Sequence, residues 1–441
     1  MIRSDISKLT TGLWLAIAAC SPSLPAQEPG PTPLELPSLT EELSEPGLAP
    51  SFSLEAVESA SEPVAATGGE QVRASRWKVS PHLHLEATYD DNIFIRATGK
   101  VADFVFTAAP GLAIGYWDYE EEMEGYLERD RSAALLDKGE GSFFVLDYTA
   151  ILLDFAQTES QDAFNQDARF DIRWRAEKLT VRASSHFESK SETDINIGGR
   201  LRRTAVATEV SADYQFSPKT SLSVGFENVI EDRDNFVRTS EWRNETSLDY
   251  QLTPLTRVGV GGALGRLEVE GQPDRVFERV LARLDYESTA KLGLAARGGL
   301  EFRQTDSAFG DSVTPVFDIK LRYAPAEGTL ITLDGYRRKK PSIAQPDEDY
   351  TATGVGLHCE RSVRTGLRLS IDGGYEHTAY DTPAGRAPRD DDFFYARVGL
   401  LYNFAHWGNI GISYEYRQKD STQPSASFEN NRITFQVGLI Y

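Results

Sequence analysis

The chain has 441 residues, of which 40% are hydrophobic, and its formal net charge is −21. After the first twenty residues, no apolar run approaches the roughly 18 residues that a membrane-spanning helix needs, which excludes a helical membrane protein. The acidic balance excludes a protein that tracks nucleic-acid phosphates, because such a protein needs a basic surface. A membrane β-barrel remains compatible with this composition, since only alternate side chains of its strands face lipid.

Residues 1–26 have the three parts of a secretory signal peptide. Arg3 and Lys8 precede the apolar stretch 13–19, and a Leu-Pro-Ala cleavage sequence follows. The Ala-Ala-Cys sequence that ends at Cys20 leaves a second interpretation open, in which this cysteine is acylated in a lipoprotein. The N-terminus therefore predicts export through the Sec pathway.

The segment 27–76 is rich in Pro, Glu, Ser and Ala and has few aromatic residues. Residues 27–75 carry nine acidic side chains and a single base, Arg73, and so supply −8 of the net charge. Such a composition cannot bury enough apolar surface to offset the entropy lost on ordering. We therefore predict a disordered periplasmic leader.

From residue 77 to the end, short segments of alternating apolar and polar residues follow one another. In the last segment Ile433 and Phe435 fall on one face, whereas Thr434 and Gln436 fall on the other. A period of two is typical of a β-strand with one apolar and one polar face. Residues 77–441 are therefore predicted to form one all-β domain.

The connections between these segments come in two kinds. Tight turns, such as 217–220 and 253–256, alternate with longer polar connections, such as 191–200 and 341–347. Short turns at one end and longer loops at the other are typical of a transmembrane, antiparallel up-and-down β-barrel, with the short turns in the periplasm. Each repeat of roughly 36 to 44 residues is then one hairpin.

We predict about eighteen strands, an even number that leaves both ends of the barrel on the periplasmic side. Residues 118–141 are acidic and lack clear alternation, so a periplasmic insertion, a short helix and an extra strand pair all fit them. Totals of sixteen to twenty strands therefore stay open. The strands are predicted near residues 79–90, 102–117, 143–157, 165–176, 179–190, 201–215, 219–231, 238–252, 255–269, 275–287, 291–305, 312–324, 328–340, 348–361, 364–378, 389–404, 408–420 and 427–441.

Closure of the sheet places the charged strand faces inside, because lipid cannot solvate them. A ring of eighteen strands is too wide for side chains alone to fill, so its lumen holds water unless loops plug it. The candidate lumen-facing residues are Arg169, Arg173, Arg175, Arg182, Glu227, Glu241, Glu245, Arg279, Arg283, Arg297, Arg303, Asp318, Arg322, Arg368, Glu415 and Arg417.

The charged faces have two interpretations. Arg-rich strands near 165–182 and acid-rich strands near 205–249 could create a transverse field that orients dipolar or sugar-like solutes. Alternatively, these residues only solvate and cross-link the wall, as charged inward faces commonly do in barrels. A conduit is compatible with both interpretations.

Enzymatic and metal motifs are weak. His82, His84 and Glu86 share one strand face, as metal ligands do, but no further ligand cluster accompanies them, and polar lumen residues are the preferred interpretation. No Gly-x-Ser-x-Gly nucleophile motif occurs. We therefore predict no catalytic residues, no metal and no cofactor.

Several short motifs resemble a known family. These are the segment 89–94, which reads Tyr-Asp-Asp-Asn-Ile-Phe, Asp103-Phe104, Ala-Pro-Gly-Leu at 109–112, Thr-Pro-Val-Phe at 314–317 and Phe-Glu-Asn-Asn at 428–431. Together they resemble the putative β-barrel porin 2 family over most of residues 77–441. The resemblance implies an outer-membrane barrel, and some related proteins are associated with exopolysaccharide export. It implies no catalytic residues.

The sequence thus favours a porin-like channel in the outer membrane of a Gram-negative-type bacterium, either a pore for hydrophilic solutes or an outlet for exopolysaccharide. An outer-membrane enzyme such as a lipase, and a surface scaffold or adhesin, are the alternatives. The expected partners are outer-membrane lipid, polysaccharide export components for an outlet, and the barrel-assembly machinery, which would recognise the last strand, ending at Tyr441. No nucleic-acid partner is expected.

Overall fold

The structure is a computed structural model that describes residues 77–117, 142–289, 291–305, 310–343, 345, 348–382 and 387–440. The predicted signal peptide, the predicted leader and the acidic segment 118–141 lie outside these residues, so what was predicted for them stays a prediction. Within the described ranges, no helix is both long and apolar enough to cross a membrane.

The described residues form eighteen strands and two short 3-10 helices, η4 (Glu159–Gln161) and η5 (Pro424–Ala426). Most of the predicted strand ends agree with the observed ones to within a few residues. The strands are β1 (Trp77–Asp90), β2 (Asp103–Trp117), β3 (Phe143–Phe155), β4 (Ala163–Arg175), β5 (Leu179–Asp194), β6 (Gly199–Ser217), β7 (Thr220–Arg233), β8 (Thr239–Thr253), β9 (Thr256–Val269), β10 (Arg275–Thr289), β11 (Leu292–Thr305), β12 (Ser312–Ala326), β13 (Thr329–Pro341), β14 (Asp349–Arg364), β15 (Leu367–Tyr380), β16 (Asp390–Ala405), β17 (Gly408–Ser421) and β18 (Phe428–Ile440).

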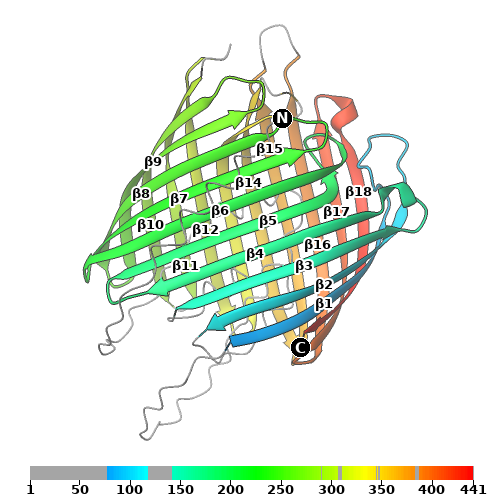
Figure 1. Ribbon diagram of the computed structural model, residues 1–441, viewed down its shortest axis with the longest axis horizontal. Helices are drawn as coiled ribbons and strands as arrows, with labels where there is room; N and C mark the ends of the chain where they lie inside the picture. Colours follow the sequence, from blue (N-terminus) through cyan, green and yellow to red (C-terminus); the bar gives the residue numbers. More distant parts are fainter. Residues whose placement is uncertain are drawn as a thin grey trace, which may run out of the picture. The chain divides into compact units, whose positions relative to one another are not determined.

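Each strand pairs antiparallel with the next, and the sheet closes where β18 pairs with β1 (Figure 1). This last pairing runs from His82 opposite Ile440 to Asp90 opposite Arg432. Closure leaves no unpaired sheet edge, which is the condition for a β-sheet to reside in lipid. The predicted all-β, eighteen-stranded, up-and-down barrel is confirmed.

The two ends of the barrel differ in their connections, as the sequence predicts. At one end most turns are two or three residues long, and Gly328 and Gly366 take positive φ angles of 69° and 75° in two of them. At this end β2 ends at Trp117 and β3 begins at Phe143, and the two strands pair directly, so no strand lies between them in the sheet. The longer connections lie at the other end, here called the long-loop end, which faces the cell exterior in barrels of this kind.

The strand alternation separates an apolar outer face from an ionic inner one. Val260 on β9 is 66% exposed and Phe435 on β18 is 56% exposed, as suits residues that face lipid. By contrast, Glu301 on β11 is fully buried and Arg417 on β17 is 1% exposed. Burial of charges on this scale requires partners on the inner face.

Candidate functional site

The inner face of β5, β6 and β7 carries a chain of ion pairs around a buried guanidinium. Arg203 on β6 pairs with Glu188 and, at 3.1 Å, with Glu192, both on β5. On its other side it meets Glu231 of β7 at 3.1 Å, which also pairs with Arg233 at 2.8 Å. The carboxylates therefore match the guanidinium groups along this part of the wall.

A second network continues on β10 and β11. The buried carboxylate of Glu301 accepts hydrogen bonds from Arg279 at 2.8 Å and from Arg303 at 2.9 Å. On the neighbouring strands Arg297 contacts Asp318 at 3.0 Å, and Arg338 contacts the same carboxylate at 2.7 Å. Arginine suits these sites because its planar fork can reach two carboxylates at once.

The tip of the β5–β6 hairpin reaches a distant part of the lumen wall. Lys419 Nζ on β17 donates to the carbonyl oxygen of Ile195 at 2.6 Å, and Arg389 Nη2 donates to the carbonyl oxygen of Asn196 at 3.0 Å. Strand β17 is six places from β5 around the ring. Contacts between walls so far apart require the tip to cross the lumen, so residues 195–198 narrow the long-loop end.

Apolar packing supports the same crossing. Ile195 at the tip, Ile95 of the β1–β2 connection, Phe393 of β16 and Phe428 of β18 form one buried cluster, and Tyr395 packs against it. Phe393 and Phe428 occupy inner-face positions of β16 and β18, where most residues are polar. The cluster is the apolar counterpart of the two hydrogen bonds, and together they fix the tip in place.

The anchor on the far wall is an ionic group with several partners. Asp391 on β16 pairs with Lys419 at 2.7 Å and with Arg389 at 2.6 Å. Arg389 lies outside the strands, just before β16. Burial acts to lower the pKa of its guanidinium, but the hydrogen bonds and the charge of Asp391 outweigh this effect and raise the pKa. Both cations that hold the tip are therefore themselves positioned by one carboxylate.

Most of the predicted lumen residues meet an oppositely charged or polar partner, often on a neighbouring strand. Among them, Arg173 lies over the Phe143 ring, Glu241 is half-buried, and Arg175 and Arg322 are exposed towards the short-turn end. A role in solute passage stays a prediction for all of them, as does the transverse field. Ion pairs of the wall include Arg169, Arg182, Glu227, Glu245, Arg279, Arg283, Arg297, Arg303, Asp318, Arg368, Glu415 and Arg417.

The histidines near the start of the barrel have ordinary polar partners. His82 Nε2 is 3.1 Å from Thr149 Oγ1, and His84 Nε2 is 2.7 Å from Glu86 Oε1. Elsewhere in the described ranges, one trio could hold a metal ion, made by Asp167, His186 and Glu188. Lys190 already pairs with both of its carboxylates, so this trio is better described as part of the wall network.

Sequence reasoning missed the tip and its anchors. Lys419 and Asp391 have the alternation of any inner-face residue, and nothing local distinguishes them from their neighbours. One signal was present: Ile195 and Ile197 are apolar residues in a connection that is otherwise polar. Apolar residues in a connection of this kind indicate a tip that packs on something.

Comparison with solved structures finds large barrels of low identity. Pseudomonas aeruginosa OccK3 (OpdO) is 13% identical, with a TM-score of 0.43 over 82% of this chain and 96% of that one. The P. aeruginosa OpdK structure with vanillate is 11% identical, with a TM-score of 0.42 over 82% and 99%. A loop L8 deletion mutant of OmpT, an outer membrane protein of Vibrio cholerae, is 11% identical, with a TM-score of 0.39 over 83% and 100%.

Comparison with curated proteins finds no match. The model of one family, described as Putative beta-barrel porin 2, matches residues 198–440, which is more than half of the chain. The matched region runs from the end of the β5–β6 hairpin to β18, and it therefore includes the anchors of the tip. This closed, porin-like barrel of the Gram-negative outer membrane belongs to the Putative beta-barrel porin 2 family.

Proposed function

We propose that the protein is a water-filled channel that passes small hydrophilic solutes across the outer membrane and is narrowed at its long-loop end. The observation that carries the proposal is the tip of the β5–β6 hairpin, held across the lumen by Lys419 and Arg389. A tip in this position restricts the width of a passage at one level. The remainder of the ring keeps the diameter that eighteen strands impose.

The electrostatics of the wall support passage of solutes. Inner-face charges pair mainly within a strand or with nearby strands, as Arg182 does with Asp213 at 2.6 Å and Glu227 with Arg243 at 3.1 Å. Because these pairs lie along the wall, they leave the middle of the lumen to water. Because cations and carboxylates pair along the wall, it gives no strong preference for one ion charge.

Planar-bilayer recording tests the channel directly. Purified protein, with folding confirmed by heat-modifiable migration in gels, is expected to give discrete conductance steps. The same recording on Lys419→Met, in which the tip loses an anchor, tests whether the tip is the restriction. Absence of steps in both folded proteins would overturn the proposal. If the tip merely closed the wild-type pore, loss of its Lys419 anchor would release it and the variant would conduct.

An outlet for exopolysaccharide is the narrower form of the proposal. It requires that deletion of the gene stop polysaccharide from reaching the cell surface while synthesis continues. No contact among the described residues favours the lipase or the adhesin alternative over a channel. Recognition by the assembly machinery through β18 also stays a proposal, and Tyr441 itself lies outside the described residues.

A further inference from the structure

The barrel wall is open between β12 and β13 near the long-loop end. Their pairing begins at Phe317 opposite Arg337 and runs towards the short-turn end. Beyond that pair, β12 continues to Ser312 and remains paired with β11, while β13 continues to Pro341 and remains paired with β14. The two strands therefore separate into a seam, defined here as residues 312–316 on one side and 338–341 on the other.

The local chemistry explains why the seam stays open. Extending the observed register by two residues places Pro315 opposite Lys339. Proline has no N–H to donate, so the ladder bond to the Lys339 carbonyl cannot form. That carbonyl instead accepts a hydrogen bond of 3.2 Å from Arg303 Nη2, and the Lys339 ammonium donates to Ser312 Oγ at 3.0 Å. Side chains thus replace the missing backbone pairing.

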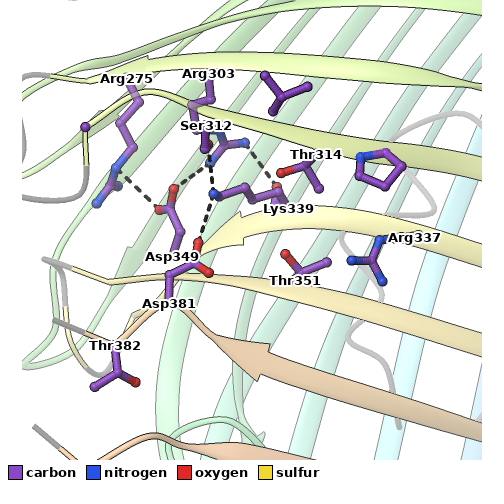
Figure 2. Close-up of a pocket in the computed structure, with 13 residues that line it drawn as sticks. Arg275, Arg303, Ser312, Thr314, Arg337, Lys339, Asp349, Thr351, Asp381 and Thr382 are labelled. Carbon is purple, nitrogen blue, oxygen red and sulfur yellow. Dashed lines mark hydrogen bonds and ion pairs between the residues drawn. The ribbon is translucent and has the colours of Figure 1, made fainter. Parts of the chain in front are cut away.

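A cavity of about 520 Å³ occupies the seam (Figure 2). Its lining includes the inner-face residues Arg275 and Arg303 together with Val313, Arg337 and Lys339, which occupy outward positions of their strands. In an intact sheet these two sets lie on opposite sides of the wall. Their meeting around one cavity shows that it passes between the strands.

The cavity is rich in cations in a chain whose net charge is negative. Arg275 and Arg303 pair with Asp349 at 3.4 and 3.1 Å, and Lys339 pairs with Asp381 at 2.8 Å (Figure 2). Arg337 adds a further charge and donates to Thr353 Oγ1 at 2.9 Å. The lining therefore holds four cations and two carboxylates, and with Glu301, which also pairs with Arg303 behind the lining, the cations still outnumber the carboxylates.

We propose that this seam binds a phosphate group of a phosphorylated glycolipid in the outer leaflet. Arg337 and Lys339 stand at outward positions, where a cation against hydrocarbon costs roughly 2–4 kcal/mol at mid-membrane and little at the interface. A guanidinium and an ammonium near the rim match the charge and hydrogen-bond acceptors of a phosphate. Val313, 59% exposed beside them, offers the apolar surface that an acyl chain would contact.

Retention of glycolipid by the full-length protein tests the proposal. Folded protein in detergent micelles is incubated with a diphosphorylated lipid A-type glycolipid, with its dephosphorylated form, or with inorganic phosphate, and bound ligand is counted by native mass spectrometry. The double variant Arg337→Gln and Lys339→Gln is compared with Arg182→Gln and Arg368→Gln, which removes two inner-face cations elsewhere. Heat-modifiable migration confirms folding, and single-channel conductance reports on the lumen independently.

We expect wild type and the Arg182, Arg368 control to retain the diphosphorylated glycolipid and the seam variant to lose at least about tenfold in affinity, as the loss of a hydrogen bond to a charged group does. Equal retention by the folded seam variant would overturn the proposal. So would equal retention of the dephosphorylated form. Binding of inorganic phosphate that depends on Arg337 and Lys339 would overturn the lipid assignment in favour of a soluble anion.

Discussion

Lys419 shows how much one side chain contributes to the passage. Its side chain is 2% exposed, and its ammonium pairs with Asp391 at 2.7 Å and donates to the Ile195 carbonyl at 2.6 Å. The same group therefore joins a strand of one wall to the tip that comes from another. Any change here alters both the charge balance of the anchor and the position of the tip.

Lys419→Met should widen the passage. The variant keeps a side chain of similar length but loses the hydrogen bond to the tip, which is worth about 1–3 kcal/mol in a buried, charged setting. We expect larger single-channel conductance or added flicker between levels. Lys320→Met, which removes an inner-face cation on β12, is the control, and an equal change in both variants would show that charge alone matters.

Pro315→Val should lengthen the β12–β13 ladder. Valine restores the N–H and favours extended backbone, so the Lys339 carbonyl regains a strand donor. We expect slower amide hydrogen exchange at residues 314–316 and weaker glycolipid retention. Pro110→Val on β2 is the matched control, because pairing with β3 skips Ala109 and Pro110 and resumes at Gly111. If amide exchange at residues 314–316 does not change, the side-chain contacts, and not Pro315, keep the seam open.

For single residues, the sequence predicts the strand face better than the interaction partners. Arg303 is expected inside from the alternation of β11, and the structure places it in a buried network. Its hydrogen bond to the Lys339 carbonyl, two strands away on β13, depends on the missing pairing between β12 and β13 at the seam. No local pattern encodes that break, although Pro315 marks the position where a ladder bond must be missing.

The sequence predicts only in part where a hairpin turns tightly and where it has a longer loop. The connection 191–200 was predicted as a longer loop, yet β5 continues to Asp194 and β6 begins at Gly199. The Asp194 carboxylate accepts hydrogen bonds from the N–H groups of Asn196 and Ile197 at 2.8 and 3.0 Å and so tightens the turn. Polar composition alone does not separate a loop from such a hairpin tip.

Gly366→Ala should destabilise the β14–β15 hairpin. The residue has φ of 75°, and an added Cβ would lie 2.6 Å from the Asn403 carbonyl oxygen, so the cost combines backbone strain with a clash. We expect a loss of more than about 1–2 kcal/mol, the usual penalty for a left-handed non-glycine residue. Urea unfolding in detergent measures the loss.

Two other glycines separate the causes. Gly198 has the same φ of 75° with no atom near an added Cβ, so Gly198→Ala measures the backbone cost alone. Gly199, with neither a positive φ nor a close neighbour, is the neutral control. If Gly366→Ala costs no more than Gly198→Ala, the clash with Asn403 is relieved by a small movement.

Closure is the property of the whole molecule on which every other feature depends. Alternation in β18 and the count of turns predicted it, because with an even strand number the last strand runs antiparallel to the first and can pair with it. The sequence did not settle whether residues 118–141 add strands, since acidic composition without periodicity fits several structures. The direct pairing of β2 with β3 removes the inserted strand pair from these alternatives.

Deletion of residues 428–441 should prevent insertion of the barrel. Without β18, strands β1 and β17 would each keep an unpaired edge, and lipid does not satisfy such backbone groups. Heat-modifiable migration and recovery in membranes are expected to be lost. Deletion of residues 27–76, the predicted leader, is the control and should leave both intact. A folded, membrane-inserted protein without β18 would contradict the closed-ring account.

The crossing of the lumen by the β5–β6 tip has a mechanical consequence. The tip is covalently continuous with one wall and hydrogen-bonded to the facing one through Lys419 and Arg389. It acts as a brace: squeezing the ring along the chord between β5 and β17 would first have to compress or break those bonds. The brace thereby couples the width of the pore at the long-loop end to the lateral pressure in the bilayer. Membrane tension is therefore a variable to control in every conductance measurement.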